Sequence, residues 1–109
     1  MDKMSALSAF AALSQETRLD VLRLLIEAGP DGMPAGDIGV RLGVRQNTMS
    51  TNLSVLAQAG LVVTRRDGRH IRYTADFDRI RGLIDFLMRD CCGGRPELCG
   101  FLPPMSCAC

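Results

Sequence analysis

Apolar residues recur at spacings of three and four over the first sixty positions, a period typical of α-helices. Glycines and one proline, at Gly29-Pro30, Gly43 and Gly60, divide this stretch and mark where helices end. Ser14 is expected to cap the second helix, ahead of an apolar stripe. The stripe consists of Leu19, Leu22, Leu25 and Ile26. The pattern predicts four helices: Ala6–Leu13, one between Ser14 and Gly29, Gly36–Leu42 and Gln46–Ala59.

The pattern changes after Gly60 and predicts a β-hairpin. The runs Leu61–Arg66 and Arg69–Thr74 are rich in β-branched residues and arginine, and Asp67-Gly68 between them is typical of a two-residue hairpin turn. Such a turn would place Arg66 opposite Arg69 and Arg65 opposite His70. The turn-rich segment 31–34, which precedes the third helix, is expected to be a loop.

A last helix is predicted from Asp76 or Asp78, which can cap it, to Cys91-Cys92-Gly93-Gly94. Its apolar stripe consists of Ile80, Leu83, Ile84, Leu87 and Met88. The fold class is therefore mainly α with a β-hairpin, in the order ααααββα. A chain of 109 residues suits one domain and excludes a multidomain enzyme. We expect a domain at residues 1–92 and a flexible cysteine-containing tail at 93–109.

The chain lacks the sequence features of export and of membrane insertion. No apolar run approaches the roughly 18 residues of a membrane span. The start, Met1–Met4, lacks the basic and apolar blocks of a signal peptide. We therefore expect a soluble cytoplasmic protein.

Positive charge is concentrated in the middle of a chain whose net charge is only +1. Residues 45–74 contain five arginines and a single acidic residue, Asp67, whereas the segments on either side are slightly acidic. A local basic block suits a surface that binds a polyanion, although five arginines are equally compatible with a solvated face.

The two helices on either side of Gly43 form a candidate helix-turn-helix, a motif that reads DNA. In the second of them Met49, Leu53 and Leu56 make the stripe that we expect to be buried. The opposite stripe is polar but uncharged, whereas a solvated face usually carries Lys and Glu. Short polar side chains can approach base edges in a major groove. This stripe consists of Asn47, Ser50, Thr51, Ser54 and Gln58.

The arginines of the hairpin give a second indication of DNA binding. Like charges that face each other across two strands are destabilising, so their presence suggests a role against phosphates. Solvation of a loop tip is the alternative. Phosphate contacts would supply affinity that does not depend on sequence and that falls steeply with salt.

The sequence resembles the arsenical-resistance repressor (ArsR) family of bacterial winged-helix metalloregulators. The resemblance rests on Ala9–Leu19, on Arg45–Leu56, on Ala59–Val62 and on Arg66–Arg69 in the hairpin, or wing. It implies a homodimeric repressor that leaves double-stranded operator DNA when a toxic metal or metalloid binds, with the first and last helices forming the dimer. The residues that would contact DNA are Arg45, Gln46, Asn47, Thr48, Ser50, Thr51, Asn52, Arg66 and Arg69.

The chain departs from the family pattern at two places. Family members often have Ser at the position of Arg45 and a His pair at Thr51-Asn52, so the operator sequence cannot be borrowed. Some members bind metal through cysteines in the first helix of the helix-turn-helix, whereas Ala35–Gly39 contains none. That type of sensor is absent.

All five cysteines lie in the last 19 residues, which points to metal-binding or redox-active thiols. Cys99 is seven residues beyond Cys92, about 10.5 Å along a continuous helix. That distance is too great for sulfurs that share one ion with bonds near 2.3 Å. Gly93-Gly94 and Pro96 would break the helix and let the chain fold back. We expect Cys91, Cys92 and Cys99 to form a three-thiolate site.

Three thiolates suit As(III) or Sb(III) as effector, and the pair plus a distal cysteine resembles the C-terminal site of one arsenic-sensing branch. Zinc or cadmium is the alternative, since Cys107 or Cys109 could complete a four-cysteine set. A thiol oxidation sensor and cysteines without a role are further possibilities. A small thiol oxidoreductase is disfavoured, because Cys-x-x-Cys is missing and the single histidine, His70, is remote. A winged-helix module that binds another protein remains the third class.

Overall fold

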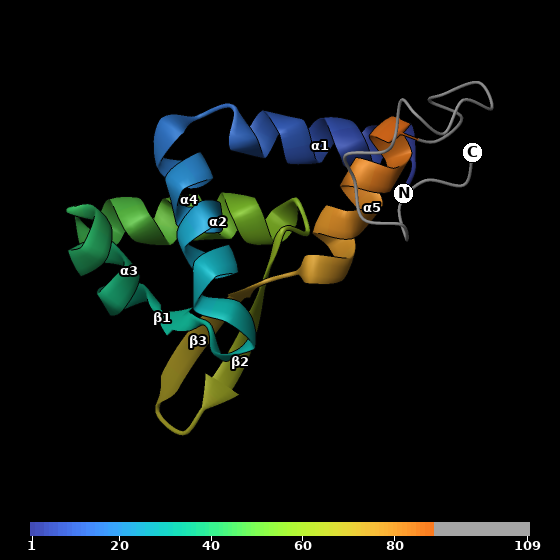
Figure 1. Ribbon diagram of the computed structural model, residues 1–109. Coiled ribbons are helices and arrows are strands. Elements are labelled where there is room, and N and C mark those ends of the chain that lie inside the picture. The colour runs from blue at the N-terminus through green and yellow to red at the C-terminus, as the bar shows by residue number, and fades with distance from the viewer. Residues whose placement is uncertain (89–109) are drawn as a thin grey trace.

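The computed structural model describes residues 1–88, which form five α-helices and a small antiparallel sheet (Figure 1). The predicted order ααααββα is confirmed, with a short 3₁₀ helix and a two-residue strand added between the second and third helices. The elements are α1 (Lys3–Leu13), α2 (Glu16–Ala28), η1 (Gly29–Asp31), β1 (Met33–Pro34), α3 (Ala35–Leu42), α4 (Gln46–Gln58), β2 (Val62–Asp67), β3 (His70–Ala75) and α5 (Phe77–Met88).

The junction of α1 and α2 differs from the sequence prediction. α1 begins three residues earlier than expected, because the Asp2 side chain accepts a hydrogen bond from the Ser5 N–H at 2.7 Å. Ser14 caps the end of α1 instead of the start of α2, since its Oγ donates to the Ala11 carbonyl at 2.7 Å. Gln15 takes the N-cap position of α2, where its Oε1 accepts from the Arg18 N–H at 2.9 Å. The expectation that Ser14 caps α2 is therefore wrong.

The sheet has the strand order β1-β3-β2, and its hairpin register is shifted from the predicted one. Asp67 pairs with His70, so the turn residues are Gly68 and Arg69. Gly68 has φ +64°, a value that a primed turn requires of its first central residue and that glycine adopts readily. Arg66 consequently faces Ile71. The predicted pairs of Arg66 with Arg69 and of Arg65 with His70 are wrong.

Residues 33–34, predicted as part of a loop, form β1, which adds a strand to the predicted two-stranded hairpin. Met33 pairs with Tyr73 and Pro34 with Arg72. Gly32 makes this approach possible, because a Cβ built there would lie 2.2 Å from the Tyr73 carbonyl oxygen. The Arg72 Nε also donates to the Asp31 carbonyl at 2.8 Å, which fastens the segment to β3.

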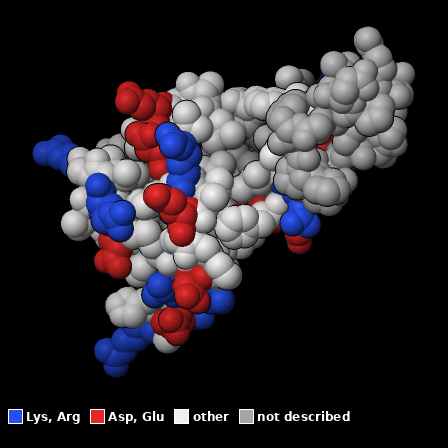
Figure 2. Space-filling model, viewed as in Figure 1, with Lys and Arg blue, Asp and Glu red and all other residues white. Residues whose placement is uncertain are grey.

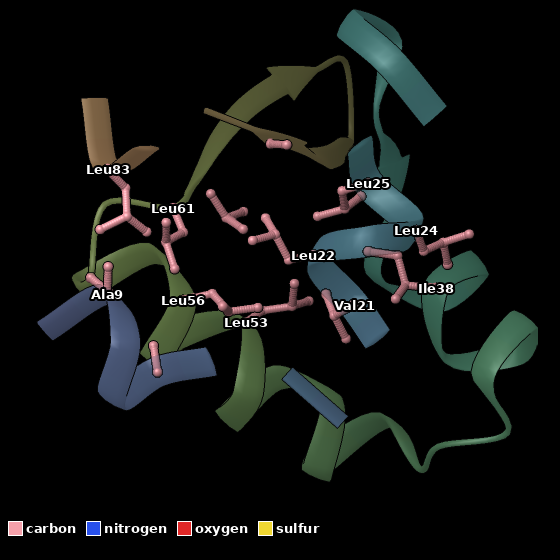
Figure 3. Packing of buried hydrophobic residues seen from close by; sticks show 14 of the residues in the cluster. Ala9, Val21, Leu22, Leu24, Leu25, Ile38, Leu53, Leu56, Leu61 and Leu83 are labelled. Carbon is pink, nitrogen blue, oxygen red and sulfur yellow. The ribbon is translucent and has the colours of Figure 1, made fainter. Parts of the chain in front are cut away.

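The core gathers apolar side chains from every helix (Figure 3). The stripe predicted for α4 is buried, with Met49 and Leu56 at 0% and Leu53 at 1% exposure. In α2 the buried face is centred elsewhere than predicted, since Leu19 and Ile26 are 42% and 41% exposed. The buried residues of α2 are Val21, Leu22, Leu24 and Leu25.

The helices α1 and α5 lie side by side at the edge of the fold (Figure 1). α5 begins beyond Asp76, whose carboxylate accepts from the Arg79 N–H at 3.0 Å, as one of the two predicted caps requires. Leu83 is the buried residue of α5 and packs in the core. In the part of the chain that the structure describes, no helix has the length and apolar character needed to cross a membrane.

Candidate nucleic-acid interface

The turn between α3 and α4 is built for close approach of the two helices. Gly43 ends α3 in the left-handed conformation with φ +67°, and the Val44 N–H donates to the Gly39 carbonyl at 2.9 Å. A Cβ at Gly39 would lie only 3.0 Å from the Val44 carbonyl oxygen. Glycine at both positions therefore lets the chain reverse within three residues and start α4 against α3.

The exposed face of α4 carries the polar stripe predicted from the sequence, and all five of its members are exposed. Two local hydrogen bonds order this face: the Thr48 N–H donates to Asn47 Oδ1 at 2.8 Å, and the Thr51 hydroxyl donates to the Asn47 carbonyl at 3.2 Å. The Thr51 oxygen still has lone pairs that can accept. The face therefore presents both donors and acceptors without a net charge.

The N-terminus of α4 is open to a ligand. Arg45 occupies the N-cap position, and its side chain makes no capping hydrogen bond. The side chains of Arg45, Gln46 and Thr48 are exposed around this end. The positive end of the helix dipole favours an anion at such a position.

Asn52 departs from the predicted DNA-contacting set. It lies on the inner side of α4 with 6% exposure, and its Oδ1 accepts a hydrogen bond from Arg18 Nη1 at 3.3 Å. A side chain enclosed in this way has no free path to a base edge. Asn52 therefore belongs to the packing of α4 against the body of the protein.

Exposed arginines line the hairpin of β2 and β3, which projects from the body of the protein (Figure 1). Figure 2 shows Lys and Arg side chains at its tip. Arg69 lies in the turn itself, and Arg66 lies one position before Asp67 in β2. Arg65 pairs with Arg72, a like-charge pair that sequence reasoning missed because its register was displaced. Arg72 directs its donors to the carbonyls of Asp31 and Gly32.

The neighbouring helices α1 and α5 expose several large apolar side chains. The buried residues of α1 are all alanines, Ala6, Ala9 and Ala12. Its larger side chains point outward: Met4 is 72%, Leu7 54% and Phe10 40% exposed. In α5, Leu87 is 55% exposed. We call this set of four residues the α1–α5 face.

The predicted thiolate site lies outside the described residues. Cys91, Cys92, Cys99, Cys107 and Cys109 all fall within 89–109. Within residues 1–88, no three His, Cys, Asp or Glu side chains come together in a way that could hold a metal ion. The site therefore remains an expectation that rests on the chemistry of the donor set.

Comparison with known protein sequences gives a consistent group of relatives. Residues 13–65 match a helix-turn-helix domain family. The chain is 35% identical over 96 residues to the HTH-type transcriptional regulator YbzH of Bacillus subtilis, covering 77% of this chain and 96% of YbzH. It is 30% identical over 94 residues to the transcriptional activator HlyU of Vibrio cholerae, covering 84% of each. It is 37% identical over 62 residues to ArsR2 of Halobacterium salinarum, covering 57% of this chain and 51% of ArsR2. The name of ArsR2 describes an arsenical resistance operon repressor.

Solved structures agree with the sequence relatives. An ArsR-like transcriptional regulator from Rhodococcus superposes with a TM-score of 0.74 at 31% identity, over 90% of both chains. A homodimeric winged helix-turn-helix DNA-binding domain from Mycobacterium bovis superposes with a TM-score of 0.63 at 28% identity, over 77% of this chain and 78% of that one. The winged helix-turn-helix that names the Mycobacterium bovis domain is also the architecture seen here, in which α3 and α4 are followed by the hairpin of β2 and β3.

Proposed function

Because the chain belongs to the ArsR-like family of winged helix-turn-helix transcriptional regulators, we propose that it is a homodimeric repressor whose release from operator DNA is triggered by As(III) or Sb(III). The observation that carries the DNA-binding part is the pairing of an exposed, polar and uncharged face on α4 with an arginine-bearing hairpin. The family membership makes the protein a regulator and not an enzyme.

On DNA, α4 lies in the major groove and the hairpin lies along the backbone. Asn47, Ser50 and Thr51 contact base edges, because amide and hydroxyl groups both donate and accept there. Arg66 and Arg69 contact phosphates, which positions the protein without reading sequence. Around the open N-terminus of α4, phosphate contacts come from Arg45, Gln46 and Thr48.

Two copies of the chain bind together through the α1–α5 face. Four large apolar side chains are between 40% and 72% exposed on adjoining helices, and burial of such side chains drives association. Two recognition helices must lie about 34–36 Å apart to enter successive major grooves. One chain presents a single α4, so a dimer is needed to occupy two half-sites.

The effector binds at Cys91, Cys92 and Cys99, which come after Met88, the last residue of α5, in the sequence. Soft thiolates suit trivalent arsenic and antimony, which take three sulfur ligands in a pyramid. Closure of this site acts on the end of a helix that contributes to the α1–α5 face, and so on the spacing of the two α4 helices. By linkage, DNA must weaken effector binding by the same factor by which the effector weakens DNA binding.

The test is DNA binding by the purified protein, measured by fluorescence anisotropy on its own promoter fragment. The wild type should bind and should be released by arsenite or antimonite. Cys91→Ser, Cys92→Ser and Cys99→Ser should each bind DNA with unchanged affinity but resist release, because serine cannot replace a soft thiolate. Cys107→Ser and Cys109→Ser serve as matched controls that respond almost normally.

The same titration separates the alternatives. If cadmium released the protein from DNA and this release required Cys107 or Cys109, the result would favour a four-cysteine zinc or cadmium site over the three-coordinate site. Normal arsenite release from Cys99→Ser would show that the chain does not fold back onto Cys91 and Cys92. If the protein showed no salt-dependent binding to any duplex, the proposal that it binds DNA would be wrong, and a module that binds another protein would be favoured. A reporter gene under its promoter distinguishes repression from activation, the activity that HlyU's name gives that relative.

A further inference from the structure

Arg18 connects three helices through its backbone and side chain. It lies in the first turn of α2, where its N–H donates to Gln15. Its Nε donates to the Ala12 carbonyl at 2.6 Å, and its Nη1 donates to Asn52 Oδ1 at 3.3 Å. The Ala12 carbonyl belongs to the last turn of α1, where unpaired carbonyls and the helix dipole favour a cation. A single guanidinium therefore joins the end of α1 to the middle of α4.

Asn52, the partner of Arg18 in α4, is a buried polar residue whose hydrogen bond has a defined direction. It is one of two buried polar residues within 1–88, and a buried amide requires a hydrogen-bond partner. Each residue turns an α-helix by about 100°. The hydrogen bond between Arg18 and Asn52 therefore restrains the rotation of α4 about its own axis, in addition to the buried stripe of α4. It thereby also restrains the direction in which the neighbouring Thr51 and Ser50 point.

Apolar packing between α1 and α4 is sparse at this junction. A hollow of about 300 Å³ lies between them, lined on one side by Ser8, Ala11 and Ala12 and on the other by Val55 and Gln58, with Arg18 at its edge. Small side chains around an open hollow make few of the contacts that would fix one helix orientation. On the α1 side of α4, the hydrogen bonds of Arg18 supply directional contacts that the sparse packing there does not.

We propose that Arg18 is a positioning residue for DNA recognition: through Asn52 it holds α4 in the rotation that presents Asn47, Ser50 and Thr51 to the groove. The same guanidinium fixes α4 relative to α1, the helix that carries most of the α1–α5 face. The inference rests on the proposed DNA-binding function and adds to it a specificity-determining residue that touches no DNA.

The first test compares promoter DNA with a random duplex of equal length at one salt concentration. Arg18→Met and Asn52→Leu should each lower the ratio of the two affinities about tenfold, the worth of one charge-assisted hydrogen bond. The double variant should lose no more than either single variant, because both remove the same interaction. Arg23→Met is the matched control: it removes the same charge from an exposed position of α2 and should leave the ratio unchanged.

Rescue distinguishes positioning from stability. Asn52→Asp keeps the acceptor and should retain the wild-type ratio while Arg18 is present, but not in the Arg18→Met background, where the carboxylate is buried without its partner. A merely structural Arg18 would lower the melting temperature of these variants and leave the affinity ratio at its wild-type value. That result would overturn the proposal.

Hydrogen exchange tests the positioning of α4 without DNA. In Arg18→Met the amides of Gln46–Gln58 should exchange faster relative to those of β2 and β3 than in the wild type. Uniform acceleration across the domain, or none, would contradict the proposal. A wild type that binds no duplex would remove the proposed function, and the exchange result would still decide whether Arg18 holds α4.

Discussion

The exposed face of α4 and the exposed face of α1 depart from a solvated helix in opposite ways. α4 places its large apolar side chains inward and short uncharged polar ones outward. α1 places alanines inward and Met4, Leu7 and Phe10 outward. Neither face is covered with the Lys and Glu that are usual on a surface helix. On the side that Figure 2 shows, charged side chains gather over α2, α3 and the hairpin and are few over α1.

The two faces of a helix can differ in side-chain size as well as in polarity. In α4 the apolar stripe alone identifies the buried side. In α1 both sides are apolar, and only the alanines permit close approach to the core. The larger side chains keep exposed apolar surface that a second chain can cover. Full burial of one such side chain is favourable by about 1.5–3 kcal/mol.

The largest expected effect comes from a charge placed on the α1–α5 face. Leu7→Glu should convert the dimer to a monomer, because it would bury a carboxylate without a partner in the interface. Affinity for a two-half-site operator should then fall at least about a hundredfold, since the half-sites are no longer occupied by linked α4 helices. Analytical ultracentrifugation and anisotropy measure the two consequences.

Val40→Glu is the matched control for oligomeric state. Val40 is 84% exposed on α3, away from the α1–α5 face, and its replacement should leave the dimer intact. Sedimentation of the wild type only as an 11.8 kDa species at micromolar concentration would contradict the dimer and the role given to α1.

A smaller effect, confined to certain DNA sequences, is expected on the face of α4. Asn47→Ala, Ser50→Ala and Thr51→Ala should each change the preferred base at a few operator positions, by roughly 1–3 kcal/mol where a paired contact is lost. Affinity for random DNA should stay the same, since these side chains carry no charge. Binding selection from a randomised operator measures the preference, and unchanged base preference in all three variants would exclude this face from base reading.

The sequence predicted the helices and the two faces of α4 well, because a period of 3.6 is a local property. It predicted the details of their junctions poorly. Ser14 and Gln15 can both cap a helix, and the choice depends on where α1 ends. The hairpin strands each lie one residue later than expected, since Gly68 and Arg69 form the turn in place of Asp67-Gly68.

The inward direction of Asn52 was predictable from spacing, because Asn52 lies three residues after Met49 and four before Leu56, on the buried stripe of α4. Its partner was not predictable. Arg18 is 34 residues away and reaches Asn52 only when α2 and α4 have packed.

The smallest expected effect lies in the hairpin and contrasts with that of α4. Arg66→Ala and Arg69→Ala should each weaken binding to all duplexes alike and reduce the slope of log affinity against log salt by about one unit. Phosphates occur at every position, so base preference should not change. Arg23→Ala, which removes one positive charge from an exposed position of α2, should leave the slope unchanged.

Arg72→Ala separates an arginine that binds DNA from one that holds the fold. Its guanidinium donates to the Asp31 and Gly32 carbonyls, so its loss should lower the melting temperature by detaching β1 from β3, with little effect on the salt slope. Arg66→Ala and Arg69→Ala should do the reverse, because their side chains are exposed. If the hairpin and α4 variants instead lost base preference to the same extent, the division between backbone contacts from the hairpin and base contacts from α4 would be wrong.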